Sequence, residues 1–173
     1  LYDYLKPFPE DLLKRFYAEN GGKMTFCRAT SSPPLAMLNS GLQLYFIKYA
    51  KPDFFKKIAH SFHFPQYLSF LFTGEMVSDY TSIGCHTGLW DYEANDYHEW
   101  VDKEEIRKLL PPIVPGNTLL KTKPELGNIP CGIGVHDSSS ALLPYIKQEE
   151  KPFALLSTGT WSICINPFNK TTL

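Results

Sequence analysis

The chain has 173 residues, of which 43% are hydrophobic, and its 17 basic and 18 acidic side chains give a net charge of -1. This length and composition suit a folded globular protein with a core and argue against disorder. A nearly neutral chain without a run of basic residues lacks the electrostatic footprint of a protein that binds nucleic acid or an anionic membrane. We therefore expect neither kind of partner.

Four cysteines, Cys27, Cys85, Cys131 and Cys164, lie far apart in or beside apolar segments. They form no CxxC pair of the kind that binds zinc or carries redox chemistry, so buried, reduced thiols are the simpler interpretation. The sequence has no stretch of roughly 20 apolar residues and no secretory signal pattern. These features predict a cytoplasmic protein.

The first half of the chain carries helix signals. Residues 10–19 have acids in the first turn and an apolar face at helical spacing, and the Asn20-Gly21-Gly22 run ends this helix. After a turn-rich connector at 30–36, Asn39 or Ser40 is expected to cap a helix that ends before Pro52, and a short helix follows it.

The segment HFPQYLSFLFTGE, residues 63–75, predicts another helix. Pro65 suits its first turn and Gly74 a position just past its end, an asymmetry typical of helix termini. Because nearly all of its faces are apolar, we expect this helix to be buried.

The following segment mixes aromatic and hydroxyl side chains. Residues 78–100 have little periodicity, which favours a short helix followed by a loop. Asp102 and Glu105 have the spacing of a capping box, and they predict a helix that Pro111-Pro112 terminates.

From residue 131 onward strand patterns appear. CGIGVH predicts a strand, and DSSSALLPYI a helix with Asp137 or Ser138 near its N-terminus. FALLS and WSICIN predict two strands joined by a tight turn at Thr158-Gly159. The charged patch at 147–151 is interpreted as a solvated connector and a domain boundary.

Asp137 places a single charge at the end of an apolar run. Burying an ionised carboxylate without partners costs roughly several kcal/mol. We therefore expect Asp137 to be paired, exposed to solvent or engaged in binding or catalysis. It has two interpretations: a helix N-cap, for which Asp is favoured, or a general base that reaches a substrate hydroxyl.

The run STGTW, residues 157–161, also has two interpretations. It is acceptable as an ordinary hairpin turn, and its backbone N–H groups and hydroxyls would also suit an anion such as a nucleotide phosphate. It lacks the spacing and the lysine of a Walker A loop. Among the five histidines only His136 stands out, because it adjoins Asp137 and could hydrogen-bond a sugar hydroxyl.

In chain order, the motifs FPQYLSFLFTGE, DYTSIGCHTGLWD, LLPPIVPGNT, GVHDSSSALL and LSTGTW resemble those of the FGGY family of carbohydrate kinases. Each motif is weak alone, but five of them in the family's order are strong. The resemblance implies an α/β protein with part of the actin-like, ribonuclease-H-like ATPase fold. It also implies transfer of the γ-phosphoryl group of MgATP to a sugar hydroxyl, with ATP and Mg²⁺ as cofactors.

By this resemblance Asp137 matches the catalytic base and His136 a sugar-binding position, while Gly159 and Thr160 match the turn that meets the ATP phosphates. No residue is assigned as a metal ligand. The HD pair followed by GTW is more similar to rhamnulose and fuculose kinases than to glycerol kinases, which implies a ketose such as L-rhamnulose or L-fuculose.

The resemblance also implies a division of the chain. Residues 1–146 would be the later part of an N-terminal kinase domain, and residues 147–173 a linker and the first hairpin of a C-terminal domain. The family's N-terminal phosphate-binding hairpin and adenosine-binding part have no counterpart in the sequence, which begins at Leu1 without Met. We therefore expect a piece of a longer kinase that is inactive by itself.

The sequence departs from the family pattern at two places, where Thr30-Ser31 replaces a common Thr-Gly and where Cys85-His86 replaces small and basic residues. Two other functions stay open: a catalytically inactive sugar- or nucleotide-binding regulator of the same fold, and a structural domain without a ligand. The expected partners are a small-molecule sugar and ATP, and a homodimer is an open alternative for the assembly.

Overall fold

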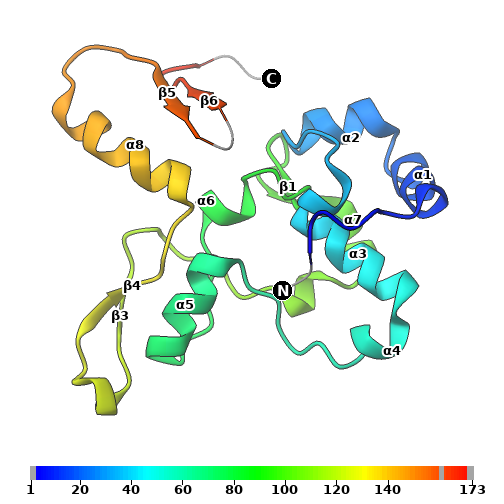
Figure 1. The fold of residues 1–173 in the computed structure, drawn as a ribbon, viewed down its shortest axis with the longest axis horizontal. Helices are drawn as coiled ribbons and strands as arrows, with labels where there is room; N and C mark the ends of the chain where they lie inside the picture. Colours follow the sequence, from blue (N-terminus) through cyan, green and yellow to red (C-terminus); the bar gives the residue numbers. More distant parts are fainter. Residues whose placement is uncertain (1–2, 160–161, 171–173) are drawn as a thin grey trace.

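The structure is a computed structural model that describes residues 3–159 and 162–170 (Figure 1). Its α-helices are α1 (Glu10–Glu19), α2 (Lys23–Ala29), α3 (Ser40–Ala50), α4 (Pro52–Phe55), α5 (Phe64–Thr73), α6 (Tyr80–Ile83), α7 (Glu99–Lys103) and α8 (Asp137–Gln148). Short 3₁₀ turns are η1 (Ala36–Leu38), η2 (Arg107–Leu109) and η3 (Pro124–Leu126).

The strands form antiparallel pairs. The pairs are β1 (Trp90–Asp91) with β2 (Asp96–Tyr97), β3 (Leu119–Lys121) with β4 (Pro130–Gly132), and β5 (Leu155–Thr158) with β6 (Ser162–Ile165). Figure 1 shows α1 to α4 and α7 gathered on one side, α8 with the β5–β6 hairpin on the other, and α5 and α6 between them. In the described part of the chain, no helix is long and apolar enough to cross a bilayer.

An aromatic cluster forms the centre of the core. The fully buried Phe16 of α1 packs edge-on against three rings, with ring centroids 5.0 Å from Phe26, 4.9 Å from Tyr45 and 5.1 Å from Trp100. Edge-to-face geometry suits the ring quadrupoles, and the one polar group of the buried indole is satisfied because Trp100 Nε1 donates to Gly88 O at 2.7 Å. This cluster joins α1, α2, α3 and α7.

The main helix predictions are confirmed. Asn20 follows the last residue of α1, α3 begins at Ser40, and Gly74 ends α5 in the left-handed conformation with φ 78°. Asn39 occupies the N-cap position of α3, but its amide holds loops instead of the helix: Oδ1 accepts from Leu35 N and Nδ2 donates to His86 O.

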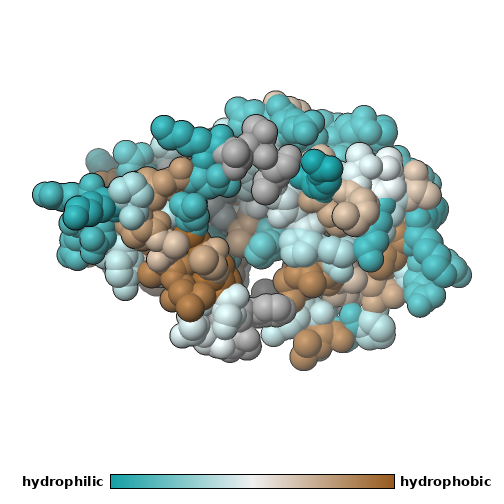
Figure 2. Space-filling model, turned by 90° about the horizontal axis from the view of Figure 1, so that it is seen from above, coloured by the Kyte–Doolittle hydropathy of each residue, from teal (hydrophilic) through white to brown (hydrophobic). Residues whose placement is uncertain are grey.

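The prediction that α5 is buried on all faces is wrong. Most of its large apolar side chains are exposed, and the residues that the helix buries form a polar stripe: Gln66, Ser69 and Thr73. These residues recur at helical spacing on one face, and that face lies against segment 132–136, whose backbone needs hydrogen-bond partners. The face that α5 turns inward is therefore its polar stripe. Figure 2 shows hydrophobic residues reaching the surface of the molecule at several places.

The capping-box prediction at Asp102 is also wrong. The helix begins earlier, because His98 is the N-cap of α7 and its Nδ1 accepts from Trp100 N. Asp102 lies inside α7, and its carboxylate instead pairs with Arg107 at 2.6 Å. Glu105 follows the helix with φ 55°, so the chain turns there.

Other differences concern elements with weak sequence signals. Helix α2 and the β3–β4 hairpin were not expected, and α8 continues to Gln148, into the predicted connector. All four cysteines are free, as expected, but Cys164 is exposed and the other three are half-buried, so the expected burial is wrong for Cys164.

Segment 131–136 is less regular than the predicted strand. Strand β4 ends at Gly132, and the chain then passes Gly134, which has φ 76°. A Cβ atom at Gly134 would lie 2.7 Å from the carbonyl oxygen of Pro65, whereas one at Gly132 would meet no atom within 4 Å. The close approach of α5 to this segment therefore requires glycine at position 134.

His63 joins two helices. It precedes α5, and its Nε2 lies 3.0 Å from the Oγ of Ser40, the first residue of α3. Desolvation by the surrounding protein lowers the pKa of His63 to about 4. The ring therefore stays neutral in the folded protein where a free histidine would be charged.

We predict that Gly134→Ala destabilises the protein by about 1–3 kcal/mol, the usual result of forcing a group into a filled space, with further strain from the positive φ. Gly132→Ala is the matched control and should change the free energy of unfolding little. Urea unfolding of both variants measures this. Equal stability of the two would contradict the proposed close contact.

We also predict a pH effect from His63. Between pH 6.5 and 4 the unfolded chain binds a proton at this residue and the folded protein does not, so stability falls as the pH falls through this range. The slope attributable to His63 is at most about 1.4 kcal/mol per pH unit. Unfolding measured against pH for His63→Gln should show a flatter slope than for His60→Gln, which alters an exposed histidine. Identical slopes would rule out a His63 ring that stays neutral in the folded protein.

Candidate functional site

A pocket of about 430 Å³ lies where α3, α5, α6 and α8 come together. Its polar lining comes from residues at the ends of these helices: Ser40, His63, Ser82, Cys85, His86, Thr87, His136 and Asp137. Leu38, Phe64, Pro65 and Val135 supply its apolar walls. A concave site with a few converging polar groups on an apolar wall is typical of small-molecule binding.

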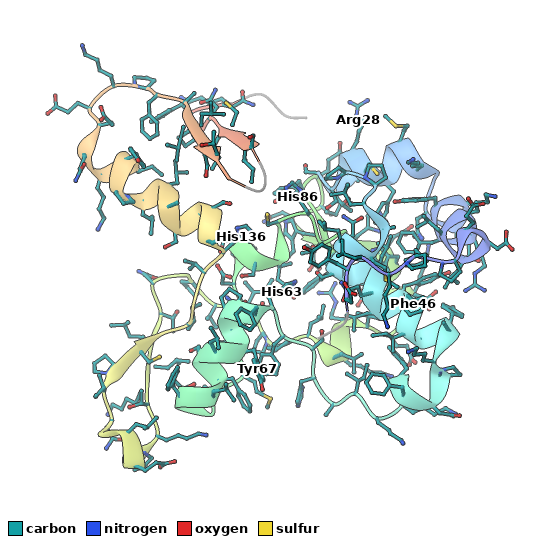
Figure 3. All side chains as sticks on the ribbon, in the orientation of Figure 1. Arg28, Phe46, His63, Tyr67, His86 and His136 are labelled. Atoms are coloured by element: carbon teal, nitrogen blue, oxygen red, sulfur yellow. The ribbon has the colours of Figure 1, made fainter. Side chains whose placement is uncertain are left out.

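Three histidines from different elements contribute to this pocket. His63 precedes α5, His86 follows α6, and His136 precedes α8; Figure 3 shows all three in the central part of the molecule. Burial lowers the pKa of His63 to about 4, and burial followed by the charge of His136 lowers that of His86. A neutral imidazole offers one donor and one acceptor, as a sugar hydroxyl requires.

Asp137 is the first residue of α8, and its side chain is 93% exposed. Its Oδ1 accepts from Ser138 N at 2.6 Å and lies 3.1 Å from His136 Nδ1. The N-cap position itself belongs to His136, whose Nδ1 lies 3.3 Å from Ser138 N. The carboxylate is therefore open to solvent at the pocket, and its hydrogen bonds are local.

The proton on His136 Nδ1 decides which of two contacts forms. With a proton, Nδ1 donates to Asp137; without one, it accepts from Ser138 N. The predicted sugar-binding residue and the predicted base are thus in direct contact, and both line the pocket.

A buried carboxylate, Asp79, lies behind this pair. Asp79 is 1% exposed and caps α6, accepting from Thr81 N at 3.0 Å, Thr81 Oγ1 at 2.6 Å and Ser82 N at 3.2 Å. Gln66 Nε2 donates to it at 3.0 Å and also to Gly134 O at 2.8 Å. These donors offset the desolvation of the charge.

Side chains of α5 and α6 hold the segment that leads to Asp137. Ser69 Oγ donates to Gly132 O at 3.0 Å, and Thr81 Oγ1 accepts from His136 N at 2.8 Å. Gln66 also donates to Gly134 O. Residues 132, 134 and 136 thus each have one backbone group hydrogen-bonded to a side chain of α5 or α6. The strand predicted here is therefore replaced by an irregular segment held by side chains.

The predicted phosphate-binding turn lies elsewhere. Strands β5 and β6 form the predicted hairpin, and Gly159 is exposed in its turn, whereas Thr160 lies outside the described residues. The pocket lining includes His136 and Asp137 but not Gly159. Within residues 3–159 and 162–170, no three His, Cys, Asp or Glu residues group closely enough to hold a metal ion.

Sequence reasoning missed several lining residues. His63 and His86 carried no spacing signal, although the unusual Cys85-His86 pair did mark this position. His86 has φ 54°, and its carbonyl accepts from Asn39 Nδ2 at 2.7 Å, so the loop is fixed. Burial and the neighbouring charge of Asp137 raise the pKa of Cys85, which keeps its thiol protonated.

Comparison with known proteins relates the chain to sugar kinases. It is 29% identical over 134 residues to a rhamnulokinase of Oceanobacillus iheyensis, covering 72% of this chain and 28% of that protein. It is 30% identical over 137 residues to a rhamnulokinase of Pectobacterium atrosepticum, covering 72% of this chain and 26% of that protein. The chain thus spans about a quarter of the length of these relatives. No family model matches it.

Solved structures also relate the chain to sugar kinases. A carbohydrate kinase from Novosphingobium aromaticivorans superposes with a TM-score of 0.76 and 27% identity, over 95% of this chain and 37% of that one. A ligand-bound xylulose kinase from Lactobacillus acidophilus, 19% identical, gives a TM-score of 0.66 over 78% of this chain and 29% of that one, which bears on the fold alone. The α/β fold class, part of the actin-like ATPase fold, is confirmed. The chain belongs to the FGGY family of carbohydrate kinases, with rhamnulokinases among its relatives, and it spans part of their length.

Proposed function

We propose that the protein carrying these residues transfers the γ-phosphoryl group of MgATP to a hydroxyl of a ketose such as L-rhamnulose or L-fuculose. The observation that carries this proposal is the position of Asp137, an exposed carboxylate at a pocket lined by imidazole and hydroxyl groups. The matched relatives are kinases named for rhamnulose and other carbohydrates.

In the proposed reaction Asp137 accepts the proton of the attacking hydroxyl. The sugar oxygen forms a bond to the γ-phosphorus, the bond from that phosphorus to the bridging oxygen breaks, and ADP leaves. The role of His136 is to hydrogen-bond the sugar beside the base. Its contact with Asp137, 3.1 Å between Nδ1 and Oδ1, also orients the carboxylate.

The nucleotide is assigned to the β5–β6 turn. Gly159, and by family resemblance Thr160, would meet the ATP phosphates with backbone N–H groups and a hydroxyl. Gly159 is exposed, which leaves its backbone accessible to a phosphate.

Mg²⁺ is held in such sites by phosphates, water and one or two carboxylates, so the absence of a ligand cluster among the described residues is compatible with it. Bound with ATP, the ion would neutralise charge on the phosphates.

We further propose that residues 1–146 belong to the N-terminal kinase domain and residues 147–173 to a linker and the first hairpin of the C-terminal domain. The cytoplasm is the proposed location. The alternative is a catalytically inactive regulator that binds a sugar or a nucleotide. It is less favoured, because the matched relatives are named as kinases.

Asp137→Asn in the full-length gene product tests the proposal. Asn retains the size and the acceptor for Ser138 N but cannot take a proton, so turnover should fall by about 10² to 10⁴. The melting temperature should change little, because the carboxylate is exposed and Asn keeps the oxygen that accepts from Ser138 N.

The assay measures phosphoryl transfer from ATP to a panel of ketoses by the unsubstituted protein and the variant, together with thermal unfolding. Transfer by the unsubstituted protein and its loss in a stable variant support the proposal. A stable Asn variant with near-normal turnover would sink the catalytic assignment, and binding of sugar without any transfer by the unsubstituted protein would favour the regulator.

A further inference from the structure

The segment from Gly132 to Asp137 obtains its shape from α5 and α6. Ser69 binds the carbonyl of Gly132, Gln66 binds that of Gly134, and Thr81 binds the amide of His136. The last of these bonds lies one residue before Asp137. It is therefore the contact best placed to set the direction of the carboxylate.

Thr81 is held on both sides. Its hydroxyl donates to the buried carboxylate of Asp79 at 2.6 Å, so its lone pairs face the amide of His136, which donates to it at 2.8 Å. Asp79 in turn is fixed by Gln66 and by the backbone of α6. A rigid chain of hydrogen bonds thus connects α5, α6 and the start of α8.

The orientation of the Gln66 amide follows from its partners. Asp79 Oδ1 and Gly134 O are both acceptors, so the group that faces them must be the NH₂. Its Oε1 is buried without a hydrogen-bond partner, which shows that the two donated bonds dominate the placement of this side chain. Gln66 therefore supports Thr81 through Asp79.

We propose that Thr81 is a positioning residue for the kinase reaction: through the amide of His136 it fixes the direction of Asp137 without touching the sugar. The pocket lining includes its neighbour Ser82 but not Thr81. This inference rests on the proposed function of Asp137. Its physical part, the hold of Thr81 on the His136 amide, does not depend on any activity.

The test compares Thr81→Val with a matched control in the full-length gene product. The control is Thr73, whose hydroxyl, like that of Thr81, donates one hydrogen bond and accepts another. It donates to Ser69 O at 2.9 Å and accepts from Glu75 N at 3.1 Å. It lies at the other end of α5. Thr73→Val therefore removes two similar hydrogen bonds away from Asp137.

We expect Thr81→Val to lower kcat by about 10- to 100-fold, as misplacement of a reacting group by a fraction of an ångström can do, with the KM for ATP unchanged. Thr81→Ser, which keeps the hydroxyl, should restore kcat. Thr73→Val should lower the melting temperature by a similar amount and leave kcat near normal. If Thr81→Val does not fold, Thr81→Cys replaces it, because a thiol is a weak hydrogen-bonding group.

Amide hydrogen exchange at His136, measured without substrate, supplies the second readout. Protection of this amide should drop at least about tenfold in Thr81→Val and persist in Thr81→Ser and Thr73→Val. Unchanged exchange at His136, or an equal loss of kcat in Thr73→Val, would overturn the positioning role. If the unsubstituted protein phosphorylates no sugar, the kinase proposal fails, and hydrogen exchange alone decides whether Thr81 holds the segment.

Discussion

The structure of the site depends on the buried carboxylate of Asp79. An ionised group at 1% exposure is costly unless donors surround it, and the donors found here are a side-chain amide, a hydroxyl and two backbone N–H groups. All are neutral; three come from Thr81 and Ser82 in the helix that Asp79 caps, and the fourth comes from Gln66 of α5. Satisfying this one charge thereby fixes α5 and α6 relative to each other, and Gln66 and Thr81 extend the fixed geometry to segment 132–136.

The orientation of α5 is unusual. A helix with aromatic and aliphatic residues on most faces would ordinarily turn the larger apolar face inward. Here Phe72 is 51% exposed while Ser69 is 4% exposed. The stripe that contains Ser69 faces segment 132–136, where Ser69 donates to Gly132 O and Gln66 donates to Gly134 O.

The sequence predicted the features that depend on local rules. Gly74 ends α5, β5 and β6 pair as the predicted hairpin, and α8 begins at Asp137, because glycine, strand and helix-start preferences act within a few residues. The family resemblance was likewise readable, since motif order survives where each motif alone is weak.

The site beyond His136 and Asp137 was not predictable in this way. His63 lies 73 residues before His136, and only the fold brings both to one pocket. The polar stripe of α5 could have been noticed at the spacing of Gln66, Ser69 and Thr73, but its partner is the backbone of segment 132–136, whose position no local pattern gives. Asp102 failed as a cap for a different, local reason: His98 takes the N-cap position of α7, and the Asp102 carboxylate pairs with Arg107.

The central claim is that this pocket presents a sugar hydroxyl to Asp137. It is tested most directly by a crystal structure of the full-length gene product with L-rhamnulose bound. The account predicts a sugar hydroxyl within about 3.2 Å of an Asp137 carboxylate oxygen, the reach of a general base. It also predicts a second hydroxyl hydrogen-bonded to His136. A sugar bound outside this pocket, or bound in it with Asp137 turned away from every hydroxyl, would contradict the account.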